Sequence, residues 1–233
     1  MPPKVVNKPR SHSVKGKDGG VNTSTAARTA ADKSGIASKG SGSDMENYFD
    51  KLKSIEKVDA DNIGGKAFAQ LLNDVKISTG TLEFYVLMWR LGVTRQGILS
   101  RAEWVTAAYT YAFDTLTQLK TKVGEWTSEV KSKKEVFAIM YNFLYDYVRG
   151  EEDRIASTES AVAAWGVLFP GDPLMLSWNK WAKEVYAEQV SRDLWRQVLL
   201  FKNAYEENRE FPVDKPWPSA IIDFCTWHKA QKG

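Results

Sequence analysis

The chain contains one cysteine and two histidines among its 233 residues. A lone cysteine cannot form a disulfide within the chain, which favours a reducing compartment. A zinc site needs at least three protein ligands, and the available residues (His12, Cys225 and His228) do not provide them at a suitable spacing. The sequence therefore predicts no metal centre and no other cofactor.

The same scarcity argues against catalysis. Cys225 and His228 are three residues apart, so a helix would place them on one face. A thiolate–imidazole pair also needs a site around it, and neither a third partner nor an oxyanion element accompanies this pair. Phosphate-binding loops and dinucleotide fingerprints are missing as well. We interpret Cys225 as a small buried apolar residue beside a surface histidine, and we expect a protein that is not an enzyme.

Long apolar runs are also missing. The sequence has no stretch of eighteen apolar residues, so it predicts no membrane-spanning helix. The first residues lack the apolar core of a signal peptide, and Pro2 stands where N-myristoylation requires glycine. We expect a protein of the cytoplasm or nucleus that has no membrane partner.

Residues 1–43 contain no aromatic residue and are rich in Ser, Gly, Lys and Thr. Such a segment buries too little apolar surface to offset its ordering entropy, so we predict a disordered tail before one folded domain over residues 44–233. The tail has a net charge of +6, and the remainder has −3. A nucleic-acid adaptor acting through this tail is one alternative function. The basic residues are scattered and the folded part is acidic, so we expect no nucleic-acid partner.

Beyond residue 44, apolar residues recur at helical spacing. The clearest stripes run through Leu82, Val86 and Trp89, and through Phe137, Tyr141, Leu144 and Val148. Glycine and proline breaks divide the domain into about nine or ten helices, with a junction near residues 130–135 between two lobes. We expect an all-α monomer.

Three helix starts can be located from their caps. Ser100 and Glu103 have the spacing of a capping box. Asp172 precedes Pro173, which is typical of an N-cap followed by the first helical residue. Ser191 is a plausible cap for the helix that contains Asp193. Asp193 then has two possible roles, helix capping or a docking charge for a basic partner.

Residues 92–103 have the length of a calcium-binding EF-hand loop, with Gly97 at the sixth position and Glu103 at the twelfth. The first, third and fifth positions, however, are Gly92, Thr94 and Gln96, which offer no carboxylate. A second candidate loop that begins at Asp59 has Ile63 at its fifth position and also fails. We predict paired helix–loop–helix units that bind no calcium. A calcium-responsive adaptor is the second alternative function.

Several aromatic motifs follow one another in the C-terminal part of the chain: Trp178-Asn179-Lys180-Trp181, Asp193-Leu194-Trp195, Leu199-Leu200-Phe201, Trp217-Pro218 and Ile222-Asp223-Phe224. Over residues 48–230 this pattern resembles the defective-in-cullin-neddylation family, with its potentiating-neddylation domain. The resemblance implies an EF-hand-like helical lobe packed on a second helical lobe. It also implies a non-catalytic scaffold, which holds a cullin and a conjugating enzyme charged with a ubiquitin-like modifier.

The resemblance implies two binding sites. The first is a pocket for the acetylated N-terminal methionine of the conjugating enzyme, and in this chain it would be lined by Phe68, Phe84, Leu87, Gln96, Leu99, Phe143, Ala164 and Val167. Acetylation removes the positive charge of the amine, so burying the N-terminus leaves no unpaired charge in the pocket. Gln96 is the residue that could hydrogen-bond the acetyl amide.

The second implied site binds the C-terminal region of a cullin through a patch that reads Asp, Ala, Asp in the family. Asp193 occupies the first position and Pro216 the second. Ile222 stands at the last position, with Asp223 one residue later. Because neighbouring helical residues point about 100° apart, we do not expect Asp223 to replace the lost acid directly. Two alternatives follow: the cullin contact is more apolar here, or the cullin partner has changed as well.

Overall fold

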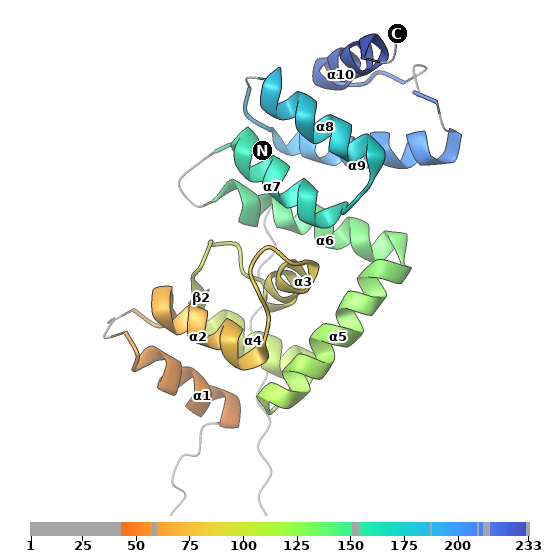
Figure 1. Ribbon diagram of the computed structural model, residues 1–233. Coiled ribbons are helices and arrows are strands. Elements are labelled where there is room, and N and C mark those ends of the chain that lie inside the picture. Colours follow the sequence, from red (N-terminus) through yellow and green to blue (C-terminus); the bar gives the residue numbers. More distant parts are fainter. Residues whose placement is uncertain are drawn as a thin grey trace, which may run out of the picture. The chain divides into compact units, whose positions relative to one another are not determined.

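The computed structural model describes residues 43–56, 60–150, 154–186, 188–208, 210–211 and 215–231. Within these residues the regular structure consists of ten α-helices and one pair of two-residue strands (Figure 1). This confirms the predicted all-α class. None of the described helices combines the length and apolar composition needed to cross a bilayer. The predicted tail lies outside the described residues, except for Ser43, which caps α1.

Residues 41–233 form one compact unit. The elements before the predicted junction are α1 (Asp44–Lys53), β1 (Asn62–Ile63), α2 (Gly65–Val75), α3 (Leu82–Leu91), β2 (Leu99–Ser100), α4 (Arg101–Tyr111) and α5 (Leu116–Ser132). Those after it are α6 (Lys134–Arg149), α7 (Thr158–Leu168), α8 (Pro173–Glu184), α9 (Arg192–Asn208) and α10 (Ser219–Ala230).

The two short strands join two helix–strand–helix units. β1 pairs antiparallel with β2, with Asn62 opposite Ser100 and Ile63 opposite Leu99. Gly97 turns the chain into β2 with a φ of 69°, a conformation that glycine adopts without strain. Units α1–β1–α2 and α3–β2–α4 therefore lie side by side through their loops. Their likeness to EF-hands stays a prediction.

All three predicted helix caps are confirmed. At α4, Ser100 and Glu103 form a complete capping box. At α8, the Asp172 side chain accepts a hydrogen bond from the backbone N–H of Met175. At α9, the Ser191 hydroxyl accepts one from the N–H of Leu194, at 3.1 Å. Each bond satisfies an N–H group that the helix itself leaves without a partner.

A single residue, Lys133, separates α5 from α6, as the predicted junction required. Its backbone is extended, with a φ of −122° and a ψ of 111°. α6 packs against α3 and α5 on one side and against α7 and α9 on the other. It is therefore the central helix of the domain (Figure 1).

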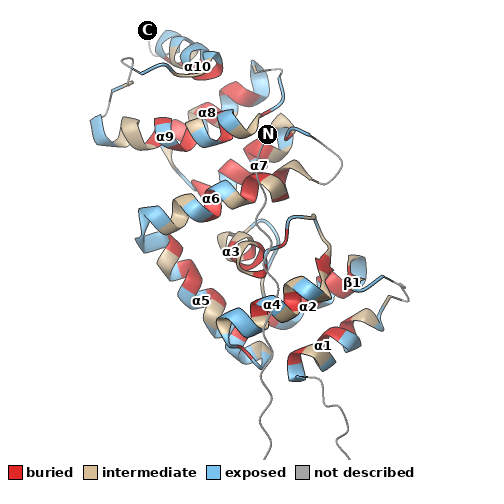
Figure 2. Cartoon of the chain, turned by 180° about the vertical axis from the view of Figure 1, so that it is seen from behind, coloured by how far each residue is buried: buried red, intermediate tan, exposed pale blue. Residues whose placement is uncertain are grey.

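Three aromatic side chains hold α6, α7 and α9 together. Trp195 stacks on Tyr141 with ring centroids 4.5 Å apart and on Trp165 at 5.3 Å. The Tyr141 hydroxyl donates to the Trp195 carbonyl at 2.7 Å and accepts from the Trp165 indole at 2.9 Å. The Trp195 indole donates to the Tyr141 carbonyl at 2.9 Å. All three side chains are fully buried, along the helix sides that are red in Figure 2.

Candidate functional site

The first turn of α9 presents Asp193 to solvent. Since Ser191 caps this helix, Asp193 is not needed as the cap. The Asp193 side chain is exposed and has no hydrogen-bond or ion-pair partner among the residues that the structure describes. A carboxylate in this position also suits the positive end of the helix dipole. Of its two possible roles, a docking charge agrees better with this geometry than capping does.

The residue beside Asp193 is fixed in place. The Arg192 guanidinium pairs with the Asp146 carboxylate of α6 and lies over the Tyr145 ring, 4.6 Å from its centroid. The Tyr145 hydroxyl in turn donates to the Val190 carbonyl, at 3.0 Å. These contacts hold the start of α9 against α6, so Asp193 projects from a rigid element.

The exposed face of α9 continues from Asp193 to a hollow. The hollow measures about 480 Å³ and lies between α9 and the segment before α10. Leu200 and Pro216 both line it, and 54% of the Leu200 surface is exposed. Seven residues correspond to nearly two helical turns, so Leu200 shares its face with Asp193. Sequence reasoning missed Leu200, although this spacing was a signal for it.

α10 adds two more predicted residues to the surface. Ile222 is 54% exposed and Asp223 is also exposed, whereas Ile221 and Phe224 are fully buried. The outer side of α10 thus carries an apolar side chain and an acid next to each other. All four predicted cullin-facing residues reach solvent, on α9, on α10 and on the segment that precedes α10.

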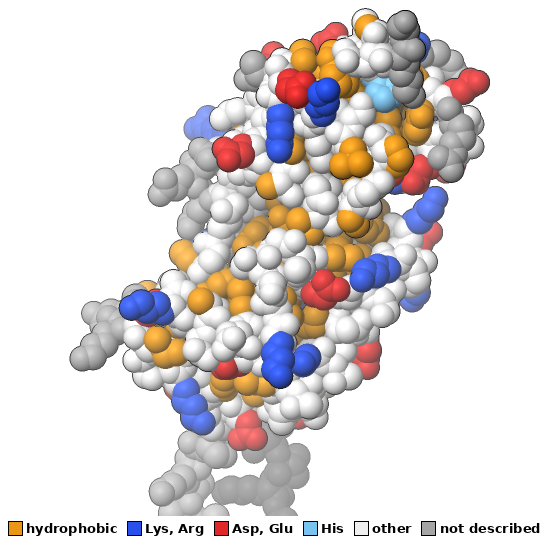
Figure 3. All heavy atoms as spheres, viewed as in Figure 1, with side chains coloured by type: hydrophobic (Ala, Val, Ile, Leu, Met, Phe, Trp, Pro, Cys, Tyr) orange, Lys and Arg blue, Asp and Glu red, His pale blue; other side chains and the backbone are white. Residues whose placement is uncertain are grey.

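The predicted acetyl-methionine residues surround α6. Five of them are buried, and they come from four elements: Phe68 from α2, Phe84 and Leu87 from α3, Leu99 from β2 and Ala164 from α7. Phe143 and Val167 are half-buried. Figure 3 shows apolar side chains gathered over the middle of one face, around the region where α3 and α6 lie in Figure 1. Most of this predicted lining is therefore integrated into the core.

Gln96 is linked to α6 by hydrogen bonds that the sequence did not indicate. Its exposed side chain donates to the carbonyls of Tyr147 and Val148 at the end of α6, at 2.9 and 3.2 Å. The Tyr147 ring lies 5.9 Å from that of Phe84, and burial raises the pKa of Tyr147 to about 12. Nothing in the sequence grouped Tyr147 with these residues, although it follows Phe143 by one helical turn.

The calcium-loop residues have other partners. Asp61 receives hydrogen bonds from Arg101, at 2.9 Å, and from Lys53, at 3.3 Å, and the Arg101 bond lowers the pKa of the Asp61 carboxyl. Glu103 closes the capping box. Asp59 lies outside the described residues. Within the described part of the chain, no three Cys, His, Asp or Glu side chains are grouped to hold a metal ion.

The interpretation of His228 as a surface residue is wrong. His228 is buried, and its Nδ1 lies 2.7 Å from the Ser177 hydroxyl of α8. Its ring contacts those of Phe211 and Phe224, with centroids 5.4 and 5.5 Å away. Phe224 is one helical turn before His228, so both face the core. Cys225 on the neighbouring face is only half-buried.

Cys225 should react slowly. Burial raises the pKa of its thiol to about 11, and nearby Lys229 only partly offsets that shift. The reactive thiolate is therefore scarce at pH 8. We expect iodoacetamide to label Cys225 about a hundredfold more slowly in the folded protein than in urea. Mass spectrometry would measure the rates, and equal rates would contradict the raised pKa.

Comparison with known proteins places this surface in a family. Residues 118–227, which include Asp193, Pro216, Ile222 and Asp223, match the family model described as Cullin binding. The chain is 24% identical to Defective in cullin neddylation protein 1 of Caenorhabditis elegans, over 78% of this chain and 71% of that protein.

Two further relatives agree. The protein of the same name from Yarrowia lipolytica is 24% identical, over 80% of this chain and 78% of its own length. DCN1-like protein 4 of Drosophila melanogaster is 18% identical, over 74% and 70%. Residues 118–227 therefore match a cullin-binding domain, and most of the chain is similar to proteins of the defective-in-cullin-neddylation family.

Proposed function

We propose that this protein promotes cullin neddylation as a non-catalytic scaffold, which binds a cullin and the charged conjugating enzyme at the same time. The observation that carries the proposal is Asp193, an exposed carboxylate without a partner among the described residues, at a rigid helix start within the cullin-binding match. The relatives from C. elegans and Y. lipolytica are named for a defect in cullin neddylation. The place of action is the cytoplasm or nucleus.

On the cullin side, a basic residue of the partner pairs with Asp193, and an apolar residue contacts Ile222. Both side chains are exposed, so binding requires no opening of the core. An ion pair that loses water in an interface fixes orientation and discriminates against wrong partners. The cullin C-terminal region that fits this surface thus presents a basic group beside an apolar one.

On the enzyme side, the acetylated N-terminus enters beside α6. Gln96 uses its NH₂ group for the carbonyls of Tyr147 and Val148. Its side-chain oxygen accepts no hydrogen bond from the described residues and is free to accept one from the acetyl amide. The methionine side chain then packs against Phe143 and Val167, which are only half-buried.

The scaffold works by placement. Holding two partners on one rigid body raises their effective concentration and restricts their orientation. The cullin lysine then attacks the thioester without help from a residue of this chain. The increase in transfer rate consequently depends on both sites, because a chain that binds only one partner does not hold the two partners together.

The decisive experiment is a reconstituted transfer reaction with the full chain, a cullin C-terminal region and the charged conjugating enzyme. We expect faster single-turnover transfer with the intact chain and no enhancement with Asp193→Lys. Lys180→Gln, a change at an exposed residue of α8, is the matched control and should keep full activity. An unchanged rate with the intact chain would overturn the proposal.

The enzyme site has its own test. Peptides from the N-terminus of the conjugating enzyme are titrated into the chain with and without the acetyl group. The free ammonium would have to lose its water on burial, so we expect the acetylated peptide to bind at least about tenfold more tightly. Equal affinities would show that the terminus stays in solvent and that the predicted pocket is not its site.

A further inference from the structure

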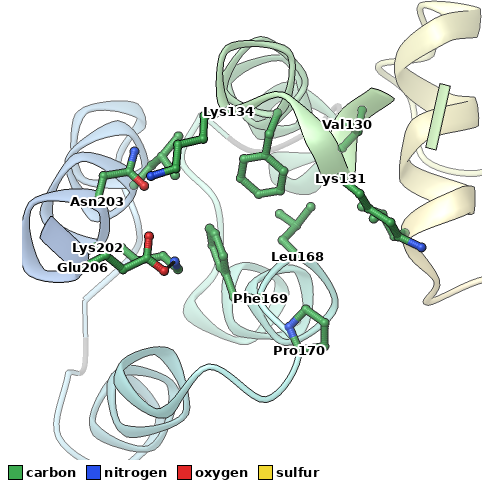
Figure 4. A pocket seen from close by; sticks show the side chains of 12 residues that line it. Val130, Lys131, Lys134, Leu168, Phe169, Pro170, Lys202, Asn203 and Glu206 are labelled. Carbon is green, nitrogen blue, oxygen red and sulfur yellow. Dashed lines mark hydrogen bonds and ion pairs between the residues drawn. The ribbon is translucent and has the colours of Figure 1, made fainter. Parts of the chain in front are cut away.

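A cavity lies where α5, α6, α7 and α9 meet. Its volume is about 310 Å³, at the lower end of the usual range for small-molecule sites. Val130, Phe137, Leu168 and Phe169 supply most of its apolar wall, and Lys134 and Asn203 stand at its edge. Figure 4 shows Leu168 and Phe169 pointing into the space and Lys134 extending toward Asn203.

This cavity is distinct from both sites of the proposed function. None of the residues predicted for the cullin or the acetyl-methionine site lines it. On α9 it is lined by Leu199, Lys202, Asn203 and Glu206, which lie about 80° to 180° around the helix from Asp193. Asn203 also borders the hollow beside Leu200 and Pro216. A ligand in the cavity would leave the Asp193 face uncovered.

The lysines around the cavity are not equivalent. Lys202 is buried and pairs with Glu206 and, at 3.3 Å, with Asp172. Lys131 pairs with Glu83 of α3 at 3.5 Å, and in Figure 4 it points away from the cavity. Lys134 has no acidic partner among the described residues. It is the lysine of this group that can meet a ligand's charge.

Two further features favour an anion at this edge. Lys134 is the first residue of α6, a helix of 16 residues whose N-terminus has no side-chain cap. The positive end of the helix dipole therefore adds to the ammonium charge, and Glu135, an exposed acid in the same turn, partly offsets both. The Asn203 side chain makes no hydrogen bond within the described residues and stands beside Lys134 with its amide oxygen toward the ammonium, so a turn of the amide would present its NH₂ donor to a ligand. Glu206 on the far wall pairs with Lys202, which also pairs with Asp172, so this group keeps one net negative charge away from Lys134.

We propose that the cavity binds a small amphipathic monocarboxylate. The apolar body of the ligand lies against Phe137, Leu168 and Phe169. The carboxylate pairs with Lys134 and accepts a hydrogen bond from Asn203. A mostly apolar pocket in which a few polar groups fix the orientation of the ligand is the usual design of small-molecule sites. The site is independent of the scaffold function.

Three eight-carbon probes test the proposal on the full chain: octanoate, octan-1-ol and octylammonium. Each is titrated by NMR, with the aromatic signals of the chain as readout. We expect saturable one-to-one binding of octanoate and at least about tenfold weaker binding of the alcohol, since a charge-assisted contact is lost. Octylammonium should bind most weakly, because its charge meets that of Lys134.

Three variants locate the head group. Lys134→Gln should reduce octanoate affinity to that of the alcohol, whereas Lys120→Gln, at an exposed residue early in α5, should leave it unchanged. Asp193→Lys should also leave it unchanged, which separates this site from the cullin site. Similar affinities for all three probes, or full octanoate affinity in Lys134→Gln, would overturn the proposal.

Discussion

Replacing Asp193 with lysine should weaken binding of the chain to a cullin C-terminal region by about thirtyfold or more. The change removes an attractive contact and adds repulsion toward the basic residue of the partner. Losing one member of an interface charge pair costs about 2 kcal/mol or more. Because Asp193 is exposed and Ser191 caps the helix, the fold should persist. Isothermal titration calorimetry would measure the affinity.

α7 provides a matched control. Glu159 is exposed and lies two residues after its cap, Ser157, as Asp193 does after Ser191. Glu159→Lys therefore places a positive charge near the positive end of a helix dipole, as Asp193→Lys does, and lowers stability by about 0.3–1 kcal/mol. Glu159 lies outside the predicted cullin surface. We expect this variant to bind the cullin normally. If both variants lost affinity equally, a general loss of stability would explain the result, and the assignment of Asp193 would fail.

Replacing Trp195 with alanine should have the largest effect on stability. The side chain stacks between Tyr141 and Trp165 and is fully buried. Its loss opens a cavity and leaves the Tyr141 carbonyl without its indole donor. Truncation of a buried tryptophan costs about 3–5 kcal/mol, which lowers the melting temperature of a domain this size by about 10 °C or more. Thermal unfolding followed by circular dichroism would show the shift.

Two comparisons separate packing from polarity. Tyr141→Phe keeps the ring but leaves the Trp165 indole without its acceptor and removes the hydroxyl's bond to the Trp195 carbonyl, at a cost of about 1–3 kcal/mol. Tyr109→Ala removes an aromatic side chain that is 90% exposed, so stability should change by less than about 0.5 kcal/mol. If Trp195→Ala behaved like Tyr109→Ala, the stack would not hold the three helices together.

Local signals predicted the limits of the helices well. Ser100, Asp172 and Ser191 each bond to backbone N–H groups as expected. Gly92 and Gly150 end α3 and α6 with positive φ. Such features depend on a few neighbouring residues, so they can be inferred without knowledge of the packing. The helical class and the junction at Lys133 followed from the same kind of signal.

Tertiary contacts were harder to anticipate. The sequence alone predicts a surface position for His228, but α8 provides Ser177 as a buried partner. The amide of Gln96 bonds to α6, which lies 51 residues further along the chain. Leu99 and Ala164 are fully buried. A local sequence pattern cannot distinguish such a core residue from one that lines a binding pocket. The sequence pattern shows which side of a helix is apolar, but it does not show what covers that side.

Lys133 is the one residue between α5 and α6. A change in its two backbone torsions would therefore rotate α6 relative to α5. A helix of 16 residues is about 24 Å long. A 10° change in the Lys133 backbone would sweep its far end through about 4 Å, a distance larger than a hydrogen bond. The packing of α3 against α6 opposes that swing. In the proposed scaffold, the distance between an enzyme beside α3 and a cullin on α9 therefore depends on two backbone torsions. One extra residue at this joint would shift Phe143 and Val167 relative to Phe84 and Leu99, so it would alter the predicted enzyme site and leave the α9 surface unchanged.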